Sequence, residues 1–205
     1  MLTLFNTRSN SLDLFNPKFE EIGIYTCGPT VYNLAHIGNL KTFFWSDFIV
    51  SVIEYLYPTR VKAIMNITDI DDKILSRLSE QTLDELLKYT KYYTQKFFED
   101  MTSLNITRYH NNYHTVTDNI IQMEQFINKL IENNYAYQVP SGSIYFDSSK
   151  IDQYPFPTIK KEHINSDYEG RKIIREQGIK DSKDFILWKV KDNEYISWKM
   201  PTLSI

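Results

Sequence analysis

The sequence predicts an α/β fold built on a parallel sheet, followed by a smaller region of short antiparallel strands. A strand pattern at Ile22–Cys27 is followed by a helical pattern that begins after His36, and a second strand pattern lies at Val61–Met65. Such a strand–helix–strand unit forms a right-handed crossover in a parallel sheet, with its ligand site at the carboxyl ends of the strands. From residue 135 onwards, short β patterns separated by Pro and Gly replace the helical periodicity.

The first elements carry clear local signals. Leu2–Asn6 suits a short edge strand, and Arg8–Phe19 reads as a polar connection. Gly28-Pro29 turns the chain after the first strand of the sheet, and Pro58 ends the helix that follows. The apolar residues of that helix recur at spacings of three and four: Leu40, Phe43, Phe44, Phe48, Val52 and Leu56.

An acidic cluster follows the second strand. Thr68–Leu78 is expected to form a helix whose capping box joins Thr68 and Asp71, with Asp69 and Asp72 near its positive end. Capping alone would explain these carboxylates, and a catalytic or metal-binding role is the alternative that the residues leave open.

Two longer helices are predicted next. Thr82–Glu85 forms a capping box, and the helix that it opens has Leu83, Leu86, Leu87, Phe97 and Met101 as its inward positions. Val116–Ile131 has the same helical periodicity.

The remaining chain predicts hairpins. Tyr135–Val139 and Ser143–Asp147 form one, and Asp184–Lys191 with Tyr195–Lys199 form another. The polar segment 148–183 between them is expected to be a loop-rich insertion.

Composition indicates a soluble globular protein of a reducing compartment. The 205 residues are 42% hydrophobic and 24% charged, with a net charge of −3, which argues against a protein that coats nucleic acid. The single cysteine, Cys27, excludes an internal disulfide. Neither a signal peptide nor an apolar run of about 18 residues is found, so we expect a cytoplasmic protein without a membrane span.

Four sequence blocks identify a family resemblance. They are CGPTVY at 27–32, HIGN at 36–39, NITDIDDK at 66–73 and DFILWK at 184–189. In this order they resemble the N-terminal half of cysteinyl-tRNA synthetases, which are class I aminoacyl-tRNA synthetases, and HIGN is a variant of their HIGH motif. The resemblance implies that residues 1–134 form the first half of a Rossmann-like (HUP-type) nucleotide-binding domain. Residues 135–205 would then be part of an α+β connective-peptide insertion, which lies near the acceptor end of tRNA in this family.

The resemblance also implies an ATP site. The residues expected there are Gly28, Thr30, His36, Gly38 and Asn39, with His36 and Asn39 in the catalytic role. A histidine at a helix start can donate to phosphate oxygens, and a glycine lets a nucleotide approach the backbone. Asn39 replaces the commoner histidine, but its amide can still donate a hydrogen bond.

The cysteine substrate would lie near Cys27, Gly28 and Thr68. Cys27 matches the first ligand of a Zn²⁺ ion that holds the substrate thiolate in this family. The other protein ligands of that Zn²⁺ ion lie in blocks that this sequence lacks. Asp69, Asp71 and Asp72 are expected to support the active site, and Mg²⁺ to accompany ATP.

The remaining histidines and the C-terminal segment are given no role in the site. His110 and His114 are four residues apart, but no acidic or thiol partner flanks them, and the resemblance places them in an ordinary connection. His163 is expected to be exposed. The string KMPTLS at 199–204 resembles the family's KMSKS loop only faintly, and that loop belongs further along the chain.

The function expected from the resemblance is cysteine–tRNA ligation, with ATP, L-cysteine and tRNA-Cys as substrates and a monomeric full-length enzyme. Because less than half of a complete family member is covered, we expect this chain to be inactive alone. A cysteine:amino-sugar ligase of the same superfamily and a non-catalytic binding module are the alternatives. A dinucleotide oxidoreductase is disfavoured, since no GxGxxG follows the first strand of the sheet.

Overall fold

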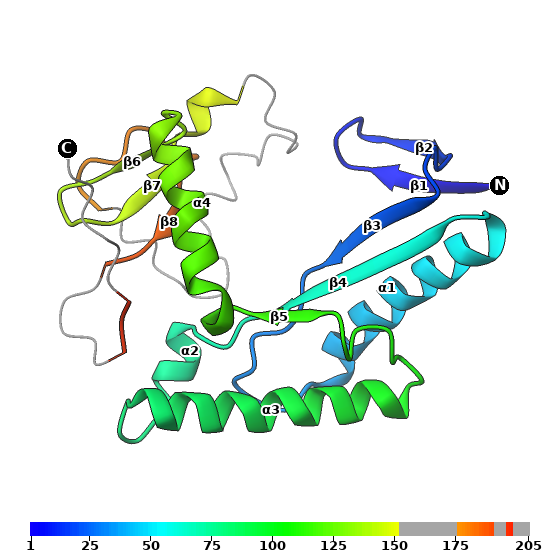
Figure 1. Ribbon diagram of the computed structural model, residues 1–205, viewed down its shortest axis with the longest axis horizontal. Helices are drawn as coiled ribbons and strands as arrows, with labels where there is room; N and C mark the ends of the chain where they lie inside the picture. Colours follow the sequence, from blue (N-terminus) through cyan, green and yellow to red (C-terminus); the bar gives the residue numbers. More distant parts are fainter. Residues whose placement is uncertain (152–175, 191–195, 199–205) are drawn as a thin grey trace. The chain divides into compact units, whose positions relative to one another are not determined.

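A three-stranded parallel sheet forms the centre of the first of two compact units in the computed structural model, which describes residues 1–151, 176–190 and 196–198. Its strands are β3 (Glu21–Thr26), β4 (Arg60–Ile67) and β5 (Tyr113–Thr115), in that order (Figure 1). The first unit consists mainly of Phe15–Ile120, and the second mainly of Ile121–Glu194 together with Thr3–Leu14.

Two helices cover one face of this sheet. They are α1 (Ile37–Leu56), between β3 and β4, and α3 (Leu83–Ser103), between β4 and β5 (Figure 1). Every second residue of β4, from Val61 to Ile67, is buried against them. This packing explains why β4 alternates between buried and more accessible residues, whereas a parallel strand covered on both faces would be buried throughout.

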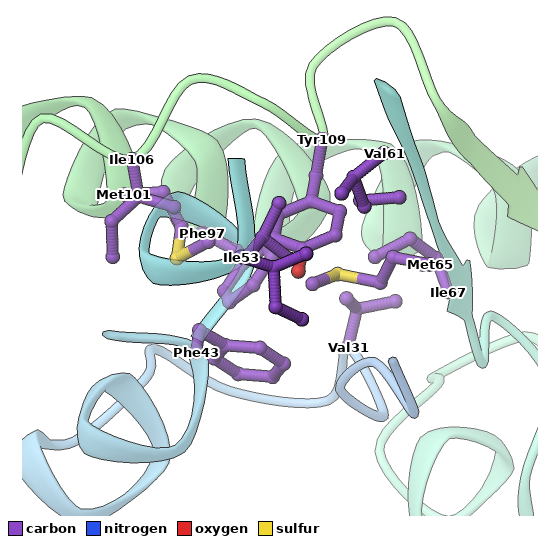
Figure 2. Packing of buried hydrophobic residues seen from close by; sticks show 12 residues of the cluster. Val31, Phe43, Ile53, Val61, Met65, Ile67, Phe97, Met101, Ile106 and Tyr109 are labelled. Carbon is purple, nitrogen blue, oxygen red and sulfur yellow. The ribbon is translucent and has the colours of Figure 1, made fainter. Parts of the chain in front are cut away.

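The core between sheet and helices is largely aromatic. Phe43 of α1 and Phe97 of α3 meet edge to face, with ring centroids 4.9 Å apart. Figure 2 shows these rings with Ile53, Met65 and Tyr109 around them. Tyr109 is fully buried, and its hydroxyl lies 3.1 Å from the hydroxyl of Thr26 and 2.9 Å from that of Ser46. The buried phenol is therefore satisfied by partners on both β3 and α1.

The strand–helix–strand prediction is confirmed. The predicted strands at 22–27 and 61–65 correspond to β3 and β4, and the helix after His36 is α1.

The predicted Thr68–Leu78 helix is wrong in length and start. The helix there is α2 (Asp72–Leu75), and its N-cap is Asp71, whose carboxylate accepts from the Lys73 backbone. Thr68 instead continues the sheet edge in a parallel bridge with Thr30. The capping box between Thr68 and Asp71 therefore does not form.

The capping signal at the start of α3 is partly confirmed. The hydroxyl of Thr82 accepts from the Glu85 backbone, but the Glu85 carboxylate accepts from Ser79 and the backbone of Glu80. Of the five predicted inward positions, Leu86, Phe97 and Met101 are buried, while Leu83 and Leu87 are exposed by 46% and 43%. The two exposed leucines lie in the first turns of α3, before it packs against α1 and the sheet.

Strand β5 was not predicted, because residues 109–115 were expected to be an ordinary connection. It is only three residues long, and it pairs in parallel with residues 65–67 of β4. So short a strand has no periodicity of its own, and the edge of β4 determines it.

The second unit contains a three-stranded antiparallel sheet of β6 (Ala136–Gln138), β7 (Ile144–Phe146) and β8 (Phe185–Trp188), in that order. The predicted hairpin at 135–147 is confirmed as β6 and β7. Of the second predicted hairpin, the first strand is present as β8, which pairs with β7. The described residues 196–198 form no strand, and residues 191–195 and 199 of that hairpin lie outside the described part of the chain.

Two further predictions are corrected. Helix α4 (Ile120–Glu132) begins later than the predicted Val116, after a short 3₁₀ turn at Thr117–Asn119. The supposed connection at 8–19 contains β2 (Ser11–Phe15), which pairs with β1 (Leu2–Asn6). Asn10 has φ = 54°, so a left-handed turn that the sequence reading did not detect joins the two strands.

Three predictions concern residues outside the described part of the chain. They are the loop-rich segment 148–183 over its residues 152–175, the exposure of His163, and the string at 199–204. Within the described residues, no helix is both long enough and apolar enough to span a membrane.

Candidate functional site

The carboxyl ends of β3 and β4 bring the predicted site residues of two sequence blocks together. The strands run parallel with Thr26 opposite Met65, so Cys27 and Asn66 leave the sheet at the same edge. Thr68 follows directly after β4. The convergence predicted from the strand pattern is therefore present in the structure.

The loop after Cys27 is hydrogen-bonded to the end of β4. The Thr68 backbone N–H donates to the Pro29 carbonyl (3.0 Å), and the Val31 N–H donates to the Thr68 carbonyl (3.1 Å). Thr30 and Thr68 thereby lie side by side in a parallel bridge. This extension of the sheet fixes the backbone on which Cys27, Gly28 and Thr30 stand.

Asn66 belongs to the sequence block at 66–73, but no role in the candidate site was predicted for it. Its side-chain oxygen accepts from the Gly28 backbone N–H and from the Tyr25 hydroxyl, both at 2.8 Å. Its amide nitrogen donates to the Thr68 hydroxyl at 3.3 Å. One side chain thus connects the strand before Cys27, the turn after it and the end of β4. The signal available in the sequence was a polar amide at the carboxyl end of a strand.

Glycine is required at residue 28 because the backbone there lies very close to the end of β4. A Cβ atom there would lie 1.7 Å from the Asn66 carbonyl oxygen and 2.7 Å from Cγ of Met65. Only glycine allows the two backbone segments to lie so close.

Cys27 itself is exposed. Although 67% of the neighbouring Tyr25 is exposed, its hydroxyl end lies against Asn66. Burial of this end and, after it, the negative charge of the Cys27 thiolate raise the pKa of Tyr25, which remains a hydrogen-bond donor at neutral pH.

The residues that the structure describes include no group of three or more His, Cys, Asp or Glu able to hold a metal ion. Cys27 with its described neighbours therefore does not fit a zinc site.

His36 forms the N-cap of α1. Its ring Nδ1 accepts from the backbone N–H groups of Gly38 (3.1 Å) and Asn39 (3.3 Å). In return, the side-chain oxygen of Asn39 accepts from the His36 backbone N–H at 3.1 Å, which completes a capping box. Both side chains are exposed at the helix start, where backbone N–H groups and the helix dipole favour an anion.

The three predicted acidic residues have different surroundings. Asp69 is 4% exposed and accepts from the Thr117 backbone N–H (3.0 Å) and from the Thr117 hydroxyl. Asp71 caps α2, and Asp72 is exposed in its first turn. Asp69 therefore ties the end of β4 to the chain after β5, a long-range contact that its position in the sequence does not indicate.

A concavity among the described residues lies elsewhere. It has a volume of about 680 Å³ and is formed between α3 and the edge of β5, with Thr90, Lys91, Glu99, His110 and Thr117 among its lining residues. Asp69 borders it, but Cys27, Thr30, His36, Asn39 and Thr68 do not. The ring nitrogens of His110 face the Thr102 hydroxyl (2.9 Å) and the Thr107 carbonyl (3.0 Å). We therefore place the candidate site at the ends of β3 and β4.

Comparison with known proteins finds one family. The family model described as "tRNA synthetases class I (C) catalytic domain" matches residues 15–203. Similar relatives include proteins named cysteine–tRNA ligase from Brachyspira hyodysenteriae (35% identical, covering 98% of this chain and 42% of the relative) and Encephalitozoon cuniculi (40% identical, 94% and 39%). Another protein of this name, from Methanosarcina acetivorans, is 39% identical over 96% of this chain and 41% of the relative. The chain thus spans about two fifths of the length of these relatives.

Proposed function

Because the chain belongs to the catalytic-domain family of class I (C) tRNA synthetases, we propose that it is part of a cysteine–tRNA ligase. This enzyme would activate L-cysteine with ATP and transfer it to tRNA-Cys. The observation that carries the proposal is the joining of the loop from Cys27 to Val31 to the end of β4, just before a helix capped by His36. The names of the relatives favour this ligase over the amino-sugar ligase and the non-catalytic module.

In the proposed first step, the carboxylate of cysteine attacks the α-phosphate of ATP and pyrophosphate leaves. Such a reaction depends mainly on positioning and on stabilising charge at the phosphate oxygens. His36 and Asn39 would donate to these oxygens at the start of α1. Gly28, Thr30 and Gly38 would lie along the nucleotide. The two glycines have no side chain that would obstruct the nucleotide.

The substrate cysteine would lie beside Cys27, Gly28 and Thr68, at the edge that Asn66 holds together. In a complete zinc site, Cys27 would supply one thiolate ligand, but structural and catalytic zinc sites need three or four protein ligands. The described residues near Cys27 offer no second ligand, so we assign no step to zinc. ATP would enter as its Mg²⁺ complex, and no described acidic cluster is assigned to that ion.

Residues 135–205, as part of the connective insertion, would lie near the acceptor end of tRNA. Lys150–Lys191 contains ten Lys or Arg and seven Asp or Glu, in a chain with a net charge of −3. This modest local excess of positive charge suits a limited contact with RNA. We propose further that the complete ligase is a monomer and that it acts in the cytoplasm, where translation takes place.

The test is cysteine-dependent exchange of pyrophosphate into ATP, measured on the longest polypeptide that the source gene encodes. Exchange should depend on cysteine and fall by about 10²-fold in His36→Ala, because a donor to the reacting phosphate is lost. Absence of exchange in a folded preparation would contradict the proposal. Exchange at an unchanged rate in His36→Ala would remove this residue from the reaction.

A further inference from the structure

We propose that the groove between α3 and the outer edge of β5 binds an extended peptide segment with a basic side chain, which adds to the three-stranded sheet as a fourth strand. The groove is the concavity of about 680 Å³ described above, and all of its lining residues belong to the first unit. The proposal goes beyond the proposed function, because the candidate site at the ends of β3 and β4 takes no part in it.

The outer edge of β5 carries backbone groups that point away from the sheet. Among the described strands, β5 pairs with β4 alone, in the order β3, β4, β5 (Figure 1). The Asn112 carbonyl accepts from β4, and the Val116 N–H donates to β4. In a parallel ladder every second residue bonds to the same neighbour, so residues 112, 114 and 116 face β4. The N–H and C=O groups of Tyr113 and Thr115 therefore face outward.

Three of these four outward groups have no hydrogen-bond partner among the described residues. They are the N–H and the C=O of Tyr113 and the N–H of Thr115. The fourth, the Thr115 carbonyl, accepts from the Asn119 side chain at 2.7 Å. Unpaired groups on a strand edge are a template for another strand, and an extended peptide satisfies them by β-augmentation. A peptide residue opposite Tyr113 can exchange both hydrogen bonds with it.

Helix α3 supplies the second wall of the groove. Its lining stripe includes Leu87, Thr94 and Phe98. The Phe98 ring packs against the Tyr113 ring with centroids 4.8 Å apart, so the side chain of Tyr113 lies on the α3 side of the sheet. Side chains of a strand alternate between the two faces, so every second side chain of an added strand would point toward α3. Leu87 and Phe98 offer these side chains an apolar surface.

The charge of the groove selects a basic segment. Three carboxylates, those of Asp69, Glu99 and Asp118, border it, and Lys91 is the one ammonium group among its described lining residues. Glu99 is paired with Lys96 at 2.7 Å. Asp69 and Asp118 accept hydrogen bonds from neutral groups, and neither forms an ion pair among the described residues. This negative surplus suits an Arg or Lys side chain, and it disfavours a second copy, which would bring two acidic grooves together.

The probe is a capped heptapeptide in which arginine and threonine alternate, added to the 205-residue chain. Two matched peptides are the controls. In one, glutamate replaces arginine, which reverses the charge and keeps the backbone. In the other, the threonine N–H groups are methylated, which keeps the charge and prevents pairing with a strand edge. By calorimetry we expect a Kd of about 1 mM or tighter for the basic peptide and binding at least about tenfold weaker for each control.

Amide hydrogen exchange reports on the strand edge directly. In the free chain, the amides of Tyr113 and Thr115 should exchange fast, whereas that of His114, which faces β4, should exchange slowly. At ten times its Kd, the basic peptide should slow the two outward amides by about tenfold and leave His114 unchanged.

Two substitutions separate the backbone from the charge. Thr115→Pro removes an outward N–H and leaves the bonds to β4, at the kind of edge position where proline is tolerated. It should weaken binding of the basic peptide by about tenfold. Thr115→Val is the matched control, because it keeps the N–H and loses only the hydroxyl that bonds Asp118, so binding should stay nearly unchanged. Asp118→Asn should weaken binding several-fold, and it keeps the test decisive if Thr115→Pro does not fold.

Equal binding of the basic peptide and either control peptide would overturn the proposal, as would no binding of the basic peptide. Slow exchange of Tyr113 and Thr115 without peptide would show that the edge is already covered. Dimers of the unsubstituted chain that dissociate in Thr115→Pro would make a second copy the occupant, and this result would overturn the proposal too. Unchanged peptide binding in Asp118→Asn and in folded Thr115→Pro would place the peptide elsewhere and overturn it equally.

Discussion

The side-chain oxygen of Asn66 lies 2.8 Å from the backbone nitrogen of Gly28, and this contact joins the ends of β3 and β4. The same oxygen accepts from the Tyr25 hydroxyl, also at 2.8 Å. Cys27 lies between these two donors in the chain. The position of its thiol therefore depends on a residue that is not itself expected to touch the substrate.

Asn66→Ala should destabilise the first unit by about 1–3 kcal/mol, because the half-buried Gly28 N–H and the Tyr25 hydroxyl lose their acceptor. Asn66→Asp keeps an oxygen in this position and should cost less. Denaturant unfolding measures both. Asn112→Ala, which removes one exposed hydrogen bond to the Arg108 carbonyl, is the control. Equal stability of Asn66→Ala and Asn112→Ala would show that the contact is dispensable.

Gly23 and Gly28 should respond differently to replacement by alanine. At Gly28 the added methyl group would lie 1.7 Å from the Asn66 carbonyl oxygen, whereas at Gly23 nothing lies within 4 Å. We expect Gly28→Ala to cost about 3 kcal/mol or more, since backbone must move. Gly23→Ala should be neutral or stabilising by about 0.5–1 kcal/mol. Thermal unfolding of the two variants provides the comparison, and similar midpoints would contradict the close approach at Gly28.

Asp69 should matter more for stability than Asp71, although both were predicted to support one site. Asp69→Ala removes a buried acceptor of two hydrogen bonds from Thr117, which we expect to cost about 2–4 kcal/mol. Asp71→Ala removes an N-cap of a short helix and should cost about 1 kcal/mol. A double-mutant cycle of Asp69→Ala with Thr117→Val should show coupling above about 0.5 kcal/mol. Additive effects would place the role of Asp69 elsewhere.

The strand–helix–strand unit could be predicted because each of its elements carries its own signal. The strand at Ile22–Cys27 is continuous and apolar, α1 has a long 3.6-residue periodicity, and Pro58 marks its end. The meeting of Cys27 with Thr68 then follows from the topology of parallel strands, without knowledge of any side-chain contact.

The parts that could not be predicted depend on contacts distant in the sequence. β5 is a strand because β4 offers a hydrogen-bonding edge. Asp69 lies before α2 and binds Thr117, 48 residues away. In the sequence, Asn66 looks like an ordinary polar residue. Its role depends on the fold, which brings it next to Gly28, 38 residues before it in the chain. A capping box can be read from sequence at Thr82, but the carboxylate of Glu85 finds other partners once the preceding turn is formed.

The second unit should lose stability in both acid and alkali through one hydrogen bond, from the Tyr137 hydroxyl to Asp184 at 2.6 Å. Burial alone would raise the pKa of Asp184, but hydrogen bonds from Tyr137 and Ser148 outweigh it and lower the pKa. Its contribution is therefore present above the unfolded value of about 3.9 and is lost as pH falls through the lower folded pKa. Burial and the bond to Asp184 raise the pKa of Tyr137 to about 12. This second contribution is present below about pH 10 and is lost as pH rises through the folded value.

Unfolding midpoints measured across this pH range should show both effects. The difference between the unsubstituted chain and Asp184→Asn should shrink on the acid side, because protonated Asp184 resembles the amide. Tyr137→Phe should flatten the alkaline decline. A constant difference at all pH values would mean that the titration of this pair is not linked to folding.

The chain alone should hold little zinc, because it offers too few ligands near Cys27. A stable zinc site takes about four ligands, with three or more from protein. The sequence contains one cysteine and four histidines, and Cys27 is exposed with no metal-holding group among the described residues. A metal held by one thiolate would exchange freely, so elemental analysis after dialysis should give far less than one zinc per chain. Cys27→Ser is the matched control and should leave this residual content almost unchanged. One tightly held zinc per chain that disappears in Cys27→Ser would show that Cys27 has protein partners beyond those that its described surroundings provide. Retention of that zinc in Cys27→Ser and its loss in His114→Ala would instead move the metal to the edge of β5.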